Sequence, residues 1–346
     1  MITRVRQAIT ALRVARAPIK DPLSPPISPP PSSQVVVPET TAAHHSLSGN
    51  VRGIFAIMIA TFVFCMGDTF MKLGSATLPT GELIFLRGCV AVTLVFCAAV
   101  WTGALARIHQ AFVAHMAHRI VGDISSALSF QAALARMSFP DLMSILQVTP
   151  LSLTAASALF LGERVGWRRW TAVGFGLIGA LLIIKPGTNA FNWWTIAAIF
   201  SVLGSTVRDV STRRMNPGIH PSAIMLLSTI VVTCSGLVLG LFETWEWPSM
   251  RLMLFMAGAA ACSMLGQLCT IIAVRSGEIS AVAPFRYTSI VWAILIGFTI
   301  WGDLPDKVSS IGIAIVIVAG LYTFFREQKL RRLAAAARRA QRQVEG

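Results

Sequence analysis

Two aspartates, each followed by a basic residue four positions later, stand in otherwise apolar stretches of this 346-residue chain. Asp68 precedes Lys72, and Asp209 precedes Arg213. Residues four apart are neighbours on one face of a helix, so each pair can share its charge. Such charges can bind the charged group of a ligand. The alternative is that Lys72 and Arg213 only extend to a polar boundary while the aspartates neutralise neighbouring charges.

Two further arginines, Arg87 and Arg286, also stand inside apolar stretches. A guanidinium group binds a carboxylate well, so both are candidates for binding a substrate or for gating access to it. Arg286 follows Pro284, and proline interrupts a helix, so a local break is predicted there. Phe285 and Tyr287 can supply an aromatic surface beside Arg286, although aromatic residues at helical spacing more often serve packing.

Several uncharged side chains are candidates for lining a cavity, namely Gln131, Gln147, Gln267 and Trp292. The alternative for each glutamine is a hydrogen bond that joins two helices, worth about 0.6 to 2 kcal/mol. The sequence leaves both alternatives open.

Motifs typical of enzymes and of nucleotide hydrolysis do not occur in the sequence. It contains no HExxH, no GxSxG and no GxxxxGK[ST]. The six cysteines lie in apolar stretches without a CxxC motif or a Cys/His cluster. We therefore predict no catalytic residue, no metal and no cofactor, and a membrane-embedded enzyme is the weaker alternative.

The composition indicates that lipid surrounds most of the chain. Hydrophobic residues make up 55% and charged residues 13%, with a mean hydropathy of +0.68, whereas a soluble domain carries about 25% charged residues. About 20 apolar residues in a helix cross the roughly 30 Å of hydrocarbon. Ten such spans are predicted, near 53–73, 82–101, 118–137, 140–161, 167–185, 192–212, 221–242, 251–274, 278–301 and 308–325.

The third and sixth spans are the least apolar, because Asp123 and Gln131 interrupt one and Arg208 and Asp209 the other. Depth along the helices, at about 1.5 Å per residue, places Asp68 and Arg87 at a similar level, so they are expected to pair. Two clusters result. The outer cluster contains Asp68, Lys72 and Arg87, and the inner cluster contains Arg208, Asp209, Arg213 and Arg286.

Basic residues are distributed unequally between the two sides of the membrane. When basic residues near the span ends are counted with the adjacent loop, except Lys72, which is counted within its span, the two tails and the even-numbered loops carry 21 Lys and Arg, and the odd-numbered loops carry 4. Cytoplasmic segments are enriched in these residues, so both termini are predicted to be cytoplasmic. Basic tails of this kind favour anionic lipid headgroups rather than nucleic acid as a partner.

The second half of the chain resembles the first at an offset of 140 or 141 residues. Leu161-Gly162-Glu163 aligns with Trp301-Gly302-Asp303, and the pair Asp68 and Lys72 aligns with Asp209 and Arg213. Five helices in each half is an odd number, so the second half would enter the membrane from the opposite side. This predicts two inverted repeats, an architecture typical of alternating-access transporters.

These features resemble the EamA-type branch of the drug/metabolite transporter superfamily over about residues 50 to 326. The resemblance rests on the ten-span layout, on Gly-Glu before the fifth helix and Gly-Asp before the tenth, and on Ala283-Pro284-Phe285-Arg286-Tyr287-Thr288. Within that branch, Asp68-x-x-x-Lys72, Phe85-Leu86-Arg87 and Asp209-x-x-x-Arg213 look most similar to S-adenosylmethionine uptake carriers. Arg208 and Asp123 depart from that narrower pattern.

The expected protein is an all-α integral membrane transporter of the inner (plasma) membrane. Its predicted parts are a disordered basic and Pro-rich tail (1–50), two EamA-like repeats (51–186 and 190–326) and a basic cytoplasmic tail (327–346). The resemblance implies alternating access for a small solute that is similar to an amino acid or to S-adenosylmethionine. Efflux or exchange of another metabolite, such as riboflavin, is the alternative, and a homodimer is left open.

Overall fold

The computed structural model describes residues 47–103, 105, 114–160, 167–186, 192–216, 219–276 and 282–345, and the regular elements in these ranges are all helices. They belong to one compact unit, His45–Gly346. The first half contains α2 (Leu47–Gly74), α3 (Thr80–Trp101), α4 (Ala114–Arg136), α5 (Phe139–Leu146), α6 (Thr149–Phe160) and α7 (Trp167–Ile184). The second half contains α8 (Trp193–Arg214), α9 (Pro221–Gly240), α10 (Met250–Ser276), the 3-10 helix η2 (Ala283–Tyr287), α12 (Thr288–Trp301) and α13 (Lys307–Glu345).

Each of the ten predicted spans coincides with one of these helices or with two consecutive ones. Most of the predicted N-terminal tail, residues 1–46, lies outside the described residues. In the described ranges, seven segments are long and apolar enough to cross a membrane: Val51–Gly74, Thr80–Trp101, Phe139–Phe160, Pro221–Gly240, Met250–Ala273, Pro284–Trp301 and Lys307–Arg326. The chain is a multi-pass membrane protein. The remaining three helices are α4 and α8, which carry the interrupting charges, and α7, whose apolar part Trp170–Ile184 is short.

Two of the spans are interrupted near proline. Pro150 lacks the N–H that would bond to the carbonyl of Leu146, and this gap separates α5 from α6. The hydroxyl of Thr149 donates to that carbonyl instead, at 2.6 Å. At the predicted break, Pro284 lies in η2, which precedes α12.

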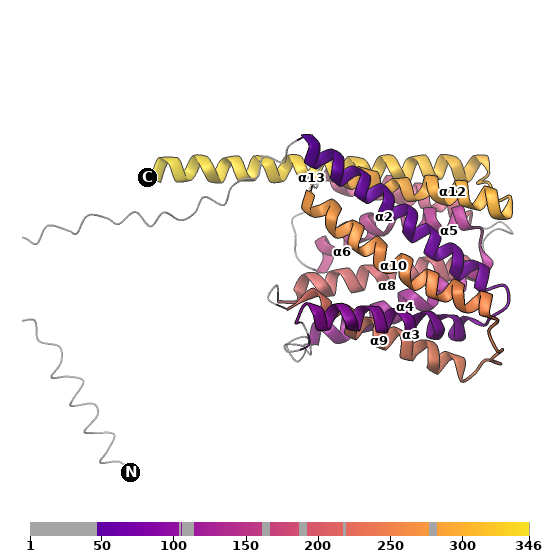
Figure 1. Ribbon diagram of the computed structural model, residues 1–346. Coiled ribbons are helices and arrows are strands. Elements are labelled where there is room, and N and C mark those ends of the chain that lie inside the picture. Colours follow the sequence, from indigo (N-terminus) through magenta and orange to yellow (C-terminus); the bar gives the residue numbers. More distant parts are fainter. Residues whose placement is uncertain are drawn as a thin grey trace, which may run out of the picture. The chain divides into compact units, whose positions relative to one another are not determined.

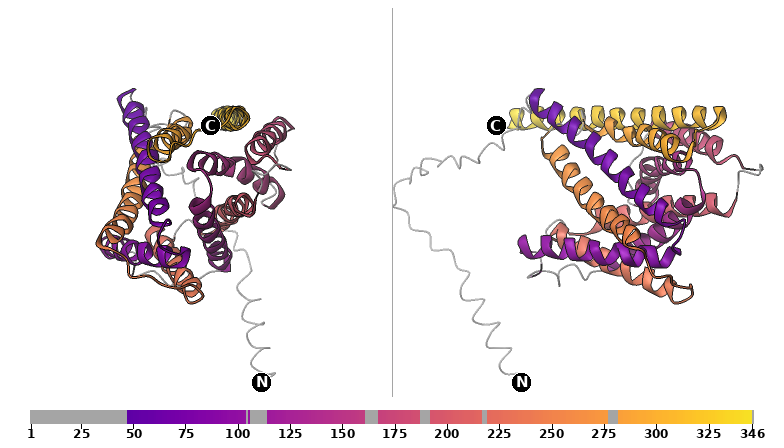
Figure 2. Two further views of the ribbon diagram at one scale, coloured as in Figure 1. Left: turned by 90° about the vertical axis from the view of Figure 1, so that its right-hand side faces the viewer. Right: turned by 45° about the vertical axis from the view of Figure 1, so that its right-hand side comes forward.

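Four pairs of helices form the main contacts of the bundle: α2 with α10, α4 with α8, α3 with α9, and α7 with α13. Figure 1 shows α3 beside α9 and α2 beside α10. In the left view of Figure 2, α2 and α10 lie together on one side, and α4 and α8 on the other. Small residues permit the closest crossings, since a Cβ atom on Gly122 of α4 would lie 2.7 Å from the Gly204 carbonyl oxygen of α8.

The bundle is packed at one end and apolar outside. Leu83, Leu134 and Phe139 are fully buried near the ends of α3, α4 and α5 that meet there. Large apolar side chains such as Phe175 and Val318 are exposed on the outer faces of α7 and α13. Because the surrounding medium is lipid, this exposure is the expected boundary with hydrocarbon.

Candidate functional site

Two neighbouring cavities occupy the interior of the bundle. The first, of about 730 Å³, lies among α4, α5, α6, α8, η2 and α13. The second, of about 720 Å³, lies among α3, α4, α8, α9 and α10. They share eight lining residues: Asp123, Ala127, Phe130, Leu153, Arg208, Asp209, Arg213 and Val232. The two cavities therefore adjoin each other along the faces of α4 and α8.

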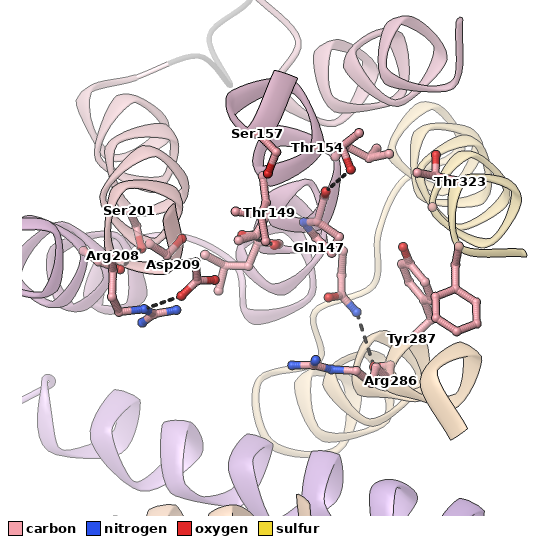
Figure 3. Close-up of a pocket in the computed structure, with 18 of the residues that line it drawn as sticks. Gln147, Thr149, Thr154, Ser157, Ser201, Arg208, Asp209, Arg286, Tyr287 and Thr323 are labelled. Carbon is pink, nitrogen blue, oxygen red and sulfur yellow. Dashed lines mark hydrogen bonds and ion pairs between the residues drawn. The ribbon is translucent and has the colours of Figure 1, made fainter. Parts of the chain in front are cut away.

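A network of alternating charges separates the cavities. Arg208 Nε lies 2.8 Å from Asp209 Oδ1 and 3.9 Å from Asp123 Oδ1 (Figure 3). Arg119 Nε lies 3.5 Å from Asp123 Oδ2 and 3.2 Å from the hydroxyl of Ser228. Arg119 and Asp123 are the more buried of these charges, with side chains 15% and 10% exposed. The network neutralises both aspartates that line the cavities.

Arg87 reaches the second cavity from α3. Its Nη2 donates to the Ser263 hydroxyl of α10 at 2.7 Å, and its buried Nε has no hydrogen-bond partner among the described residues. Among the described residues, no carboxylate oxygen lies within 4 Å of the Arg87 guanidinium group. The direct ion pair that we expected with Asp68 is therefore not present, although the two charges attract each other at longer range. Asp68 itself lines neither cavity.

The two interrupted helices meet at the first cavity. Gln147, at the end of α5, donates to the Ser289 hydroxyl at 2.7 Å and to the Arg286 carbonyl at 3.5 Å. The side chains of Arg286 and Tyr287 come from η2 into the same cavity (Figure 3). The guanidinium of Arg286 forms no ion pair within 4 Å in the described part of the chain. The predicted break at Pro284 and the unpredicted break at Pro150 thus place polar groups at one site.

Of the other predicted residues, Asp209 and Arg213 line both cavities, and Gln131 and Gln267 line the second. Arg213 donates to the Ser157 hydroxyl at 3.1 Å. The amide nitrogen of Gln131 is buried without a partner among the described residues.

Besides Asp68, three predicted residues lie away from both cavities. Lys72 donates to the Leu134 carbonyl at 3.1 Å and to that of Met137, and its ammonium group lies 5.3 Å from the ring of Trp301. It therefore caps the C-terminal end of α4, where a cation is favourable. Phe285 packs beside Ile57 and Val282. Trp292 contacts the ring of Phe62 at 5.2 Å.

Sequence reasoning missed the hydroxyl groups that line the first cavity, which are Ser126, Thr149, Thr154, Ser157, Ser201, Ser205 and Thr323. A signal was available on α8, where Ser201, Ser205, Asp209 and Arg213 recur every four residues. That spacing is a polar stripe on one helix face. In the described ranges, no group of three or more His, Cys, Asp or Glu side chains is placed to hold a metal ion. The arrangement offers charged and hydroxyl groups for binding.

An apolar bundle around a polar, charged interior defines a membrane protein that binds a polar solute. The model of the EamA-like transporter family matches residues 51–185. A pseudopaline exporter of Pseudomonas aeruginosa (strain UCBPP-PA14) is 24% identical over 269 residues, which cover 77% of this chain and 94% of the exporter. Residues 51–185 therefore form an EamA-like domain, and the similarity to the exporter extends over most of the chain.

Other relatives align over shorter regions. A riboflavin transporter of Vibrio cholerae is 26% identical over 55% of this chain and 64% of its own length. An S-adenosylmethionine uptake transporter of Rickettsia prowazekii is 25% identical over 52% of this chain and 61% of its own length. A solved crystal structure aligns with 80% of this chain and 96% of its own, with a TM-score of 0.57 and 17% identity. The similarity to that crystal structure concerns the fold alone.

Proposed function

We propose that this chain is a secondary transporter that carries a small organic metabolite across the inner membrane by alternating access. The observation that supports this proposal best is that two interrupted helices meet at a polar cavity. Gln147 follows α5, and Arg286 lies in η2, at nearly corresponding positions of the two halves of the chain. Interrupted helices at corresponding positions are the usual pointer to a transporter's binding site.

The pairing of helices supports an arrangement of two inverted repeats. Exchange of the two halves would convert the α2–α10 contact into the α8–α4 contact, and would leave the α3–α9 and α7–α13 pairs unchanged. Contacts at the level of residues agree. A Cβ atom on Gly67 of α2 would lie 3.1 Å from Cys262 of α10, and one on Gly122 of α4 would lie 2.7 Å from the Arg208 nitrogen of α8.

The location of the cavities supports an inward-open state. Ser157, Arg213 and Thr323 line the first cavity near the ends of α6, α8 and the final span, which the charge distribution predicts to be cytoplasmic. At the opposite ends, Leu83 and Phe139 belong to the packed core. Solute would then exchange with the cytoplasm while the outer side stays closed.

The names of the relatives supply the candidate solutes and both directions of transport. S-adenosylmethionine is a candidate for uptake, pseudopaline is a candidate for export, and riboflavin is a candidate for transport in either direction. Purified protein in liposomes should accumulate one of a panel of labelled metabolites with saturation and without chemical change. A chemically altered solute would indicate an enzyme instead, and the absence of saturable uptake for the whole panel would contradict the proposal.

A matched pair of variants tests the site once a transported solute is known. Gln147→Leu removes the hydrogen bond to Ser289, and it should lower transport at least about tenfold, since about 1.4 kcal/mol is a factor of ten. Thr299→Ala removes a hydroxyl that donates to the Leu295 and Ile296 carbonyls of its own helix. It should leave transport unchanged. Equal activity of the two variants would exclude Gln147 from the transport site.

A further inference from the structure

The charges that line the two cavities do not balance. Among the residues that the structure describes, the lining contains five arginines, Arg87, Arg119, Arg208, Arg213 and Arg286, and two aspartates, Asp123 and Asp209. When Arg213, which has further contacts, is left aside, two positive charges remain in excess. One remains even if Asp68, which attracts Arg87 at longer range, is counted as well.

The excess charge is located on particular side chains. Asp123 and Asp209 are engaged by Arg119 and Arg208, so they are not available to neutralise other arginines. Arg87 has a hydroxyl partner, and its buried Nε has none among the described residues. The guanidinium of Arg286 makes no ion pair within 4 Å in those ranges. A buried cation without a counter-charge is costly, and an anionic ligand would offset that cost.

The surroundings favour a carboxylate on a small organic molecule. A guanidinium group presents a planar fork of donors that matches a carboxylate in two parallel hydrogen bonds. Gln147 and Tyr287 add neutral polar groups beside Arg286, and Phe130 and Phe324 provide apolar walls. A volume of about 730 Å³ is suited to a small-molecule ligand.

We propose that the transported solute is a small organic anion of net negative charge whose carboxylates bind at Arg286 and Arg87. The proposal rests on the transport function proposed above and deepens it, since it names the charge class of the solute and so disfavours S-adenosylmethionine, which is a net cation, and riboflavin, which is neutral. Charged cavities with apolar walls concentrate ions of the opposite sign, so the positive interior also excludes cations.

The local potential can be measured without knowledge of the solute. None of the six native cysteines lines either cavity, so they can be replaced to give a cysteine-free background. Ala127→Cys places a thiol on α4 between the cavities, and Met250→Cys places one at the exposed start of α10. Each thiol is reacted with sulfonatoethyl (anionic) and trimethylammonioethyl (cationic) methanethiosulfonate in detergent.

The ratio of anionic to cationic reaction rates should be about tenfold higher at position 127 than at position 250. Arg286→Gln and Arg87→Gln should each lower the ratio of anionic to cationic rates at position 127 severalfold. Arg251→Gln is the matched control, because Arg251 lines neither cavity and stacks on Phe255 at 5.5 Å. An equal or lower ratio at position 127 than at position 250 would overturn the proposal.

A transport experiment separates the two proposals. Liposomes containing the protein are offered glutarate, glutaramide and 1,5-diaminopentane, which share one carbon skeleton, together with the labelled metabolites used above. Saturable uptake of glutarate or of an anionic metabolite, reduced by Arg286→Gln, supports the inference. Saturable uptake of neutral or cationic solutes alone would overturn it and leave the transport function standing. If no solute were taken up, the proposed function would fail and the substrate class with it.

Discussion

Arginine side chains in the interior of this protein differ in what neutralises them. Arg208 contacts a carboxylate at 2.8 Å, whereas Arg87 contacts the neutral hydroxyl of Ser263 at 2.7 Å. The Ser263 hydroxyl donates a hydrogen bond to the Ala259 carbonyl at 2.9 Å, so its oxygen can accept a hydrogen bond from Arg87. A hydroxyl therefore positions a buried cation that has no close counter-charge in the described part of the chain.

Ser263→Ala should destabilise the protein by about 1–3 kcal/mol, because it leaves another donor of buried Arg87 without an acceptor. Ser235→Ala is the matched control, since the Ser235 hydroxyl donates to the Val232 carbonyl of its own helix. Its expected effect is within about 0.5 kcal/mol. Thermal unfolding in detergent compares the two variants. Equal unfolding temperatures would show that Arg87 finds another partner and that Ser263 does not position it.

At the scale of elements, the approach of α4 to α8 determines how the charge network is held. A Cβ atom on Gly204 would lie 2.7 Å from the Ser126 nitrogen and 2.9 Å from the Gly122 oxygen, so the backbones are nearly in contact. The crossing places Asp123 beside Arg208. The same close approach leaves no room for a side chain at position 204.

Gly204→Ala should therefore destabilise the bundle by at least about 1–3 kcal/mol through overpacking. Gly174→Ala on α7 is the control, because an added Cβ atom there meets nothing within 4 Å. It should be neutral or stabilising by up to about 1 kcal/mol, as alanine favours a helix over glycine. The stability of each variant is measured as the fraction of protein that stays monodisperse after heating in detergent. A harmless Gly204→Ala would mean that α4 and α8 can separate at little cost.

The end of α7 and the start of α13 are joined by an exposed ion pair outside the spans. Lys185 Nζ lies 2.5 Å from Asp306 Oδ2, and Oδ1 of Asp306 accepts from the Ser309 amide at 2.8 Å as a helix cap. These bonds, with the Lys185 side chain first, lower the pKa of Asp306 from 3.8 to about 2. A lowered pKa means that the contribution is present above about pH 4 and is lost as the pH falls to about 2.

Asp306→Asn should cost less than about 1 kcal/mol at pH 7, because the Asp306 side chain is 55% exposed and solvent screens the pair. The difference from the parent protein should shrink as the pH falls from 4 to 2, and also in 1 M salt. Asp306→Ala additionally loses the cap, worth about 1 kcal/mol. Unfolding temperatures of the parent protein and of both variants, measured across this pH range, test whether Asp306→Ala is more destabilising than Asp306→Asn. An undiminished difference at pH 2 would rule out the ionised carboxylate as its source.

For the whole molecule, the sequence predicts where helices lie better than what their charges contact. Long apolar runs determine the spans, because unpaired backbone groups cannot face lipid. Proline also marked the break before α12, and Pro150 marks a second break that we did not predict. The depth argument paired Asp68 with Arg87, but the Arg87 guanidinium donates to the Ser263 hydroxyl of α10 instead. The depth of a residue along a helix does not give the rotation of the helix about its axis. The side chains that meet between helices therefore could not be predicted from depth.

The orientation of the whole molecule is the last prediction, and it rests on the split of 21 to 4 basic residues between the two sides. Reporter fusions after residues 188 and 305 should report the external side. Fusions after residue 216 and at the C-terminus should report the cytoplasm, because Lys and Arg near span ends are retained there. An alkaline phosphatase and a fluorescent-protein reporter at each position give opposite signals, so each serves as the control for the other.

The C-terminal fusion is decisive, because α13 carries its basic segment on the same side as the mouth of the first cavity, near Thr323. A cytoplasmic C-terminus would mean that the cavity opens toward the cytoplasm and that the structure is inward-open. An external C-terminus would reverse that assignment, because the same cavity would then face outward. It would also require that positive charges had been translocated against the usual bias.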